Sequence, residues 1–132
     1  MTTALQVVTS ALERPGVVPT GQTVPNDKAV KGLELLNDWL AGLKNDGLDL
    51  QLATLALSDT VYLDASEMSC LKDNLTVLVA DHWKLPIPQT VRESAVKLLD
   101  NVRDKYLQAD IEEMELPSGL VSAGGSDIRS GA

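Results

Sequence analysis

The stretch from Asp27 to Gly47 constrains the fold more than any other part of this 132-residue chain. Its apolar residues recur every three or four positions, which is the period of one face of a helix. That face carries Ala29, Leu33, Leu36, Leu40 and Leu43, and a second stripe carries Val30, Leu35 and Trp39. Asn26 is a suitable N-cap and Gly47 a suitable left-handed stop. We therefore expect a central helix over residues 27–46, contacted on two sides.

The composition limits what can pack around this helix. Hydrophobic residues make up 44% of the chain, which is enough for one packed domain. Aromatic residues make up only 3% and Phe is absent, so the core must be built from Leu, Val and Ala. Such side chains favour packing of helix on helix over a β-sandwich or barrel.

Capping signals predict three further helices, over residues 3–13, 65–83 and 88–109. Thr2 or Thr3 can cap the first, before Pro15 and Gly16 end it. Asp64 with Glu67 forms a capping-box pattern for the second. Pro88 suits the first turn of the third.

The hydrophobic period changes after Gly47. Leu48, Leu50 and Leu52 alternate with polar residues, and a turn-like Ser58-Asp59-Thr60 precedes another apolar run. This pattern predicts a short β-hairpin over residues 48–63. Because an isolated two-stranded ribbon is marginally stable, we expect it to lean on helices or on a neighbouring chain.

The end of the chain differs in composition from the rest. Residues 111–132 are rich in acidic residues, then in Gly and Ser, which predicts an extended arm that is disordered in the free monomer. The predicted fold is therefore mainly α: a small bundle of about four helices with a β-hairpin in residues 1–110, followed by this arm. The apolar residues of the arm are spaced like anchors for a partner's grooves: Ile111, Met114, Leu116, Leu120, Val121 and Ile128.

Charge and single residues exclude several functions. The formal charge of −8 repels phosphate, so nucleic-acid binding is not expected as the main task. Cys70 is the only cysteine and His82 the only histidine, which excludes an intrachain disulfide and multi-histidine metal sites. No apolar run approaches the ~20 residues of a membrane span, and the N-terminus lacks the basic region of a signal peptide. We expect a soluble protein made inside the cell.

Few residues suit catalysis. His82 lies on the apolar stripe of its helix and is expected to be a core or interface residue, and Cys70 is expected to be buried. No phosphate-binding loop or nucleophile elbow occurs. No catalytic residue, metal ligand or cofactor is predicted. Acid/base cleavage of a glycoside would have as candidates only Glu112, Glu113 and Glu115.

The order of these features resembles a known family. A short helix ends in ALERPGVV, a long helix carries LELLNDWL, and NDGLDL follows. After it come a ribbon, a helix bearing LTVLVADHW, a proline-containing joint, a further helix and an MELPSGL-type tail. This order is similar to the head-to-tail adaptors of short-tailed bacteriophages, also called tail accessory factors or packaged-DNA stabilisation proteins. One turn after Trp39, where the family carries a tryptophan, this chain has Leu43.

The resemblance implies a structural virion protein in the neck of a phage particle, assembled in the host cytoplasm. It implies a twelvefold ring that docks on the portal protein, closes the DNA-filled head and receives the tail hub and the fibres or spikes. DNA would pass through the lumen without specific binding. The C-terminal arm would contact the portal.

Two other functions stay open at this point. A cell-wall (peptidoglycan) hydrolase on the same scaffold would use the acidic residues named above. An acidic helical protein-binding module, unrelated to phages, would mimic the charge of DNA. A turnover assay with carboxylate variants separates the first from the adaptor, and size in solution or in the particle separates the second.

Overall fold

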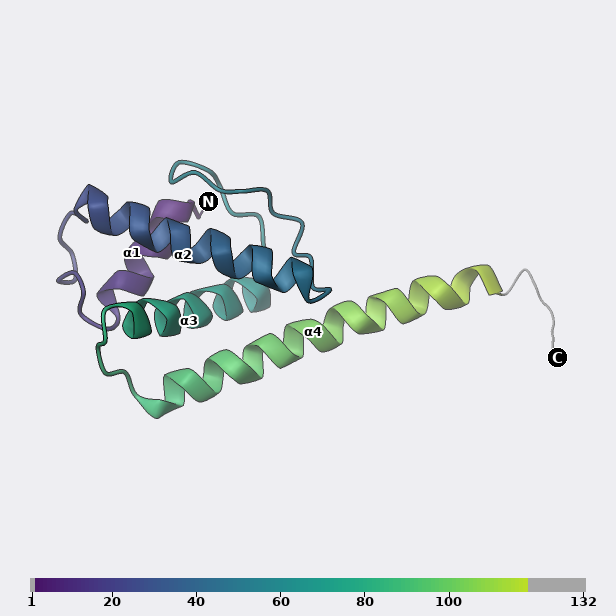
Figure 1. Ribbon diagram of the computed structural model, residues 1–132. Helices are drawn as coiled ribbons and strands as arrows, with labels where there is room; N and C mark the ends of the chain where they lie inside the picture. The colour runs from purple at the N-terminus through teal and green to yellow at the C-terminus, as the bar shows by residue number, and fades with distance from the viewer. Residues whose placement is uncertain (1, 119–132) are drawn as a thin grey trace. The chain divides into compact units, whose positions relative to one another are not determined.

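The computed structural model describes the backbone of residues 2–118 and the side chains of residues 2–108. Its helices are α1 (Ala4–Glu13), α2 (Asn26–Asn45), α3 (Ala65–His82) and α4 (Gln89–Ser118) (Figure 1). The chain divides into two compact units, Met1–Asp100 and Asn101–Ala132. The prediction of a mainly helical bundle is confirmed.

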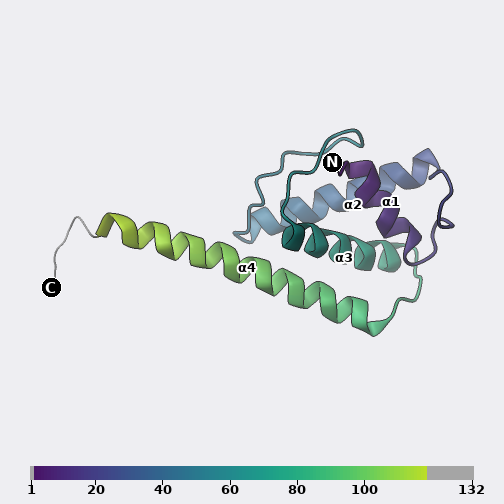
Figure 2. The same ribbon diagram turned by 180° about the vertical axis from the view of Figure 1, so that it is seen from behind.

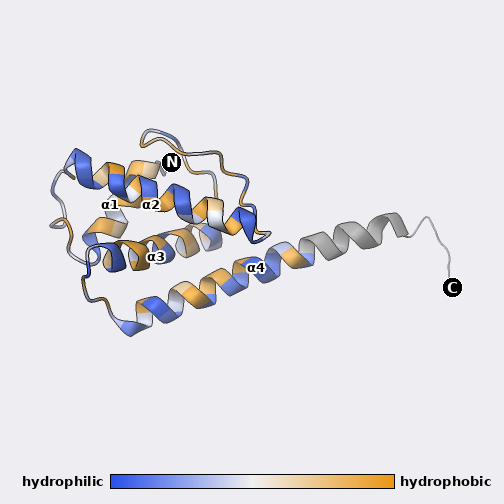
Figure 3. Ribbon diagram, viewed as in Figure 1, coloured by the Kyte–Doolittle hydropathy of each residue, from blue (hydrophilic) through white to orange (hydrophobic). Residues whose placement is uncertain are grey.

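The shortest helix, α1, forms the centre of the core of the first unit. It contacts both α2 and α3, and it crosses α2 in both views (Figures 1 and 2). It is largely apolar along its length (Figure 3). Its inward residues are fully buried, with exposed fractions of 0%: Ala4, Val7, Val8, Ala11 and Leu12. The expected core of Leu, Val and Ala is thus confirmed, with α1 rather than α2 as its most buried element.

The long helix α2 is contacted on two sides, by α1 and α3, as expected. Leu36 and Leu43 of its main stripe are buried. Val30 of the second predicted stripe is 48% exposed, so that stripe is only partly inward. Gly32 lies where α2 meets α1, and a Cβ there would stand 2.6 Å from Cγ1 of Val8. The missing side chain therefore allows the two helices to approach closely.

The predicted capping signals form hydrogen bonds at two helix starts. The Thr3 hydroxyl accepts the N–H of Gln6 while the Gln6 side chain accepts the N–H of Thr3. Asp64 and Glu67 make the same reciprocal pair at the start of α3. Each pair occupies backbone donors that a helix leaves without an internal partner. Asn26, by contrast, is the first residue of α2 instead of its cap.

Helices α1, α2 and α3 end in the same hydrogen-bonding pattern. The N–H groups of Val17, Leu48 and Leu85 donate to carbonyls five residues earlier, at 3.0, 2.9 and 2.8 Å. This closure requires a left-handed residue immediately before the donor. Gly16 and Gly47 fill that position with φ of 92° and 96°, whereas α3 uses Lys84 with φ of 55°. The predicted stop at Gly47 is confirmed.

The predicted β-hairpin over residues 48–63 is not formed. The segment contains no strand, and its only β-bridge pairs Thr60 with Thr3. The N–H groups of Ala4 and Leu5 donate to the carbonyls of Asp59 and Leu57, at 2.8 and 3.0 Å. Backbone groups that a hairpin would have paired with each other thus serve the N-terminus of α1, where helical N–H groups lack internal acceptors.

The last helix is longer than predicted. It begins after Pro88, as expected, but continues past Ala109 to Ser118. The arm predicted over residues 111–132 therefore begins as helix, since the local run of Glu, Met and Leu favours helix. Residues 119–132 lie outside the described residues.

Candidate functional site

A double hydrogen bond from α2 fixes the segment that follows it. The Asn37 side chain accepts the N–H of Leu55 at 2.9 Å and donates to the carbonyl of Leu55 at 3.1 Å. The amide thereby makes the pair of bonds that a neighbouring strand would make. Leu55 itself is 8% exposed and belongs to the core cluster. The chain is thus held against α2 at this point.

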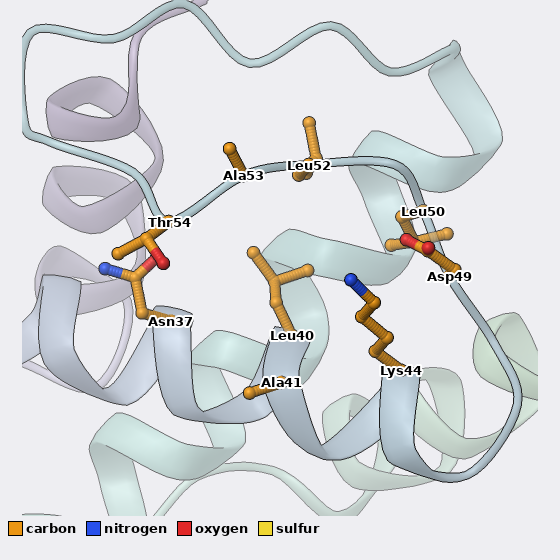
Figure 4. Close-up of a pocket in the computed structure, with 9 residues that line it drawn as sticks. All are labelled: Asn37, Leu40, Ala41, Lys44, Asp49, Leu50, Leu52, Ala53 and Thr54. Atoms are coloured by element: carbon orange, nitrogen blue, oxygen red, sulfur yellow. The ribbon is translucent and has the colours of Figure 1, made fainter.

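Between this anchor and the end of α2, the chain passes over the helix and leaves a groove of about 380 Å³ (Figure 4). The floor comes from α2 and the opposite wall from residues 49–54. In Figure 4 the side chains of Leu40 and Lys44 rise from α2 toward this wall. The lining residues are Asn37, Leu40, Ala41, Lys44, Asp49, Leu50, Leu52, Ala53 and Thr54.

The groove carries one charged group of each sign. The Asp49 carboxylate accepts the N–H of Gln51 at 2.7 Å, which holds Gln51 at φ of 60°. The Lys44 ammonium makes no hydrogen bond or ion pair with any residue in 2–108. It stands in the last turn of α2, where the helix dipole favours a cation. The Lys44 ammonium is therefore available to a ligand.

A second polar cluster joins α1, α3 and the first turns of α4. Asp73 on α3 accepts hydrogen bonds from Arg14 and Ser94, both at 2.7 Å. Arg14 also reaches the hydroxyl of Thr76 at 3.4 Å, and Thr76 is fully buried. Each group of this cluster is thus occupied by another, so the cluster serves to hold three helices together.

Two further links tie α4 to α3 within the first unit. Asn74 donates to the carbonyl of Ala95 at 3.1 Å. Arg92 donates to Asp81, with its closer bond at 2.7 Å. These hydrogen bonds from Arg92 lower the pKa of the Asp81 carboxyl below its ordinary value. Together with the bond from Ser94, the links fix α4 over residues 92–95.

The sole histidine and the sole cysteine do not come together. His82 is exposed at the end of α3, with its ring edge against Trp83 at a centroid distance of 4.6 Å. The expectation of a core position is therefore wrong, and that of an interface position stays a prediction. His82 is exposed because α3 ends at this residue, so no further turn of the helix follows the apolar stripe. Cys70 is buried, as expected, at 2% exposure. Asn74 lies 3.5 Å from its sulfur. The two residues therefore form no nucleophile and base couple.

The residues predicted to bind a portal lie at the end of the chain. Ile111, Met114 and Leu116 belong to the backbone of α4. Leu120, Val121 and Ile128 lie outside the described residues. The glycosidase candidates Glu112, Glu113 and Glu115 also belong to α4. Their grouping as a site stays a prediction.

Sequence reasoning missed the groove. Asn37 was a signal for it, because a polar amide among the leucines of a core-facing helix needs a partner. Nothing in the sequence indicated that this partner would be the backbone of Leu55, eighteen positions away.

Among residues 2–108, no cluster of three or more His, Cys, Asp or Glu side chains is placed to hold a metal ion. None of the described helices is long and apolar enough to cross a membrane. No family model matches the chain, and no curated protein or solved structure is significantly similar to it.

Proposed function

We propose that this protein is a head-to-tail adaptor of a short-tailed bacteriophage: a structural protein that forms a ring on the portal, closes the DNA-filled head and carries the tail components. The observation that carries the proposal is the order of the elements together with the sequence stretches on them. ALERPGVV spans the end of α1, LELLNDWL lies within α2, and LTVLVADHW spans the end of α3. A proline joint and a further helix, α4, follow in the order that the resemblance implies, whereas the ribbon expected between α2 and α3 is an irregular segment in this chain.

The charge of the chain supports a passive relation to DNA. The chain has 19 acidic and 11 basic residues. Arg14, Lys31 and Arg92 are each paired with a carboxylate, which reduces the positive charge available to a phosphate backbone. A ring with such walls lets DNA pass without holding it.

Several of the described carboxylates take part in structural contacts. Asp73 and Asp81 are engaged by arginine, and Asp64 by the start of α3. A glycosidase needs one carboxyl group with a raised pKa beside a second carboxylate. Among the described groups with a shifted carboxyl pKa, Glu34 and Asp81, the shift is downward in both. These two groups suit structural pairing rather than acid catalysis.

The test uses the full-length protein and the portal ring of the phage that encodes it. We expect a stable complex with twelve copies per portal ring, seen by native mass spectrometry and as an added ring in negative-stain images. A protein that stays monomeric and leaves the portal ring unchanged would refute the adaptor. In parallel, turnover of peptidoglycan that Glu113→Gln abolishes would assign the hydrolase instead.

A further inference from the structure

An open stretch of backbone borders the groove between α2 and residues 49–54. Leu52, Ala53 and Thr54 make no backbone hydrogen bond to any described residue, and Ala53 and Thr54 are exposed. The chain is fixed on either side of them, because the N–H of Leu48 donates to Leu43 and Leu55 is paired with Asn37. The donors and acceptors of three residues that form neither helix nor turn are thus held in place and left to solvent.

Extended backbone with open hydrogen-bonding groups is the template to which another strand adds. The usual protections of such an edge include a lysine on the strand, a proline or a covering helix. Residues 51–54 contain neither Lys nor Pro. The open edge therefore lacks the sequence features that discourage pairing.

The groove beside this edge supplies what a binding strand needs for its side chains. Leu40, Ala41 and Leu50 give it apolar walls, and its volume of about 380 Å³ lies within the range of small binding sites. Asp49 is held by the N–H of Gln51, whereas the Lys44 ammonium is unpaired. A ligand side chain that reaches Lys44 is therefore expected to carry a carboxylate.

We propose that residues 52–54 and this groove bind an extended peptide segment of another protein by adding it as a β-strand. The segment would place apolar side chains at alternate positions in the groove and an acidic side chain at Lys44. Its backbone would pair with Leu52–Thr54. This inference stands on the groove alone and does not depend on the adaptor role.

The probe is the N-acetylated, C-amidated hexapeptide Val-Thr-Val-Thr-Glu-Thr, whose two valines and glutamate share one face of a strand, titrated into the full-length protein and followed by amide chemical shifts in NMR. We expect saturable shifts at residues 51–54 and at Lys44. Of the two peptides methylated on alternate backbone nitrogens, the one methylated on the N–H groups that face the edge should lose binding, because it cannot donate to the edge. Replacing its Glu with Lys should also weaken binding.

Variants of the protein supply matched controls. Neighbouring residues of an extended chain point their N–H groups to opposite edges, so Ala53→Pro and Thr54→Pro each remove one donor, and only one of them faces the peptide. One of these variants should lose binding and the other retain it, with unchanged melting, since neither N–H is bonded in the free protein. Lys44→Ala should weaken binding about two- to fivefold. Lys72→Ala, which removes an equal charge from α3 away from the groove, should not.

Three results would overturn the proposal. They are the absence of shifts at millimolar peptide, shifts confined to other parts of the chain, and equal binding by the two proline variants. Shifts at 51–54 that grow with protein concentration in the absence of peptide would assign the edge to a second copy of this chain, and so would overturn a foreign strand as its partner.

Discussion

Gly32 lies where α2 approaches α1 closely. A Cβ at this position would stand 2.6 Å from Cγ1 of the buried Val8, whereas nothing lies within 4 Å of a Cβ at Gly42 on the same helix. Gly42→Ala should therefore stabilise the protein by about 0.5–1 kcal/mol through helix propensity. Gly32→Ala gains the same propensity but overpacks the contact, so its unfolding free energy should lie about 1–3 kcal/mol below that of Gly42→Ala.

Urea unfolding of both variants measures this difference. Because Val8 is β-branched and fully buried, it has little freedom to move aside. Equal stabilisation of the two variants would mean that α1 and α2 separate at no cost, contrary to the packing described above.

Lys84 occupies a backbone conformation that favours glycine. Its φ of 55° completes the end of α3, as Gly47 with φ of 96° completes the end of α2. A side chain in this conformation costs roughly 1–2 kcal/mol, part of which glycine recovers despite its greater freedom in the unfolded chain. Lys84→Gly should therefore raise the unfolding free energy by about 0.5–1 kcal/mol. Gly47→Ala, the reciprocal change, should lower it by about 1 kcal/mol, and thermal melting of the pair checks both signs.

The Asn37 side chain on α2 pairs with the backbone of Leu55 as a neighbouring strand would. Asn37→Ala leaves the N–H and carbonyl of the buried Leu55 without partners, at a cost of about 1–3 kcal/mol. Asn45→Ala, also on α2 but exposed at its end, is the matched control and should be neutral or slightly stabilising. Hydrogen exchange at the Leu55 amide should become much faster in Asn37→Ala alone. Unchanged protection there would show that the loop is held by its apolar contacts instead.

The link between α3 and α4 should respond to pH. Arg92 lowers the pKa of the folded Asp81 carboxyl below its ordinary value of 3.8. A lowered pKa contributes stability that is complete above the unfolded pKa and is lost as pH falls through the folded one. The stability difference between the wild type and Arg92→Ala should therefore be constant from neutral pH down to about pH 5 and vanish at more acidic pH. It should be small, because both side chains are more than one-third exposed.

Denaturant titrations at a series of pH values measure this difference, with Lys97→Ala as a control for charge removed elsewhere on α4. Added salt should shrink the Arg92 effect at neutral pH. A difference that persists unchanged at pH 2 would contradict the ion pair as its cause.

The helices could be predicted from the sequence because their signals are local. Thr3, Asp64 and Gly47 cap or end helices through backbone groups only a few residues away, so the local sequence is enough to predict them. The segment 48–63 was predicted as a hairpin because its leucines alternate. Its backbone instead bonds with the backbone of Thr2, Ala4 and Leu5 and with the side chain of Asn37. Those partners are distant in sequence, so no local sequence pattern predicts them. The groove depends on the same distant bonds and was missed for the same reason.

The hydrogen bonds that join α4 to α3 predict how the fold responds when the end of the chain is deleted. Ser94, Ala95 and Arg92 make the hydrogen bonds described between α4 and α3, and all three precede residue 111. Deletion of residues 111–132 therefore leaves the core and these bonds in place, and the truncated protein should retain its helical circular dichroism and melt as a cooperative unit. The deletion removes every residue predicted to bind the portal: Ile111, Met114, Leu116, Leu120, Val121 and Ile128.

Binding of this truncated protein to the portal ring, compared with the full chain, tests the arm separately from the fold. We expect the truncated protein to lose binding, because the apolar burial that offsets the cost of ordering an arm lies in the deleted residues. A milder variant, Leu116→Ser with Leu120→Ser, should weaken binding at full chain length and so separates side-chain burial from mere length. Undiminished binding by the truncated protein would move the portal interface onto residues 1–110. Loss of folding on truncation would instead mean that residues 111–132 make essential core contacts. That result would contradict the prediction, drawn from the bonds at residues 92–95, that residues 1–110 fold by themselves.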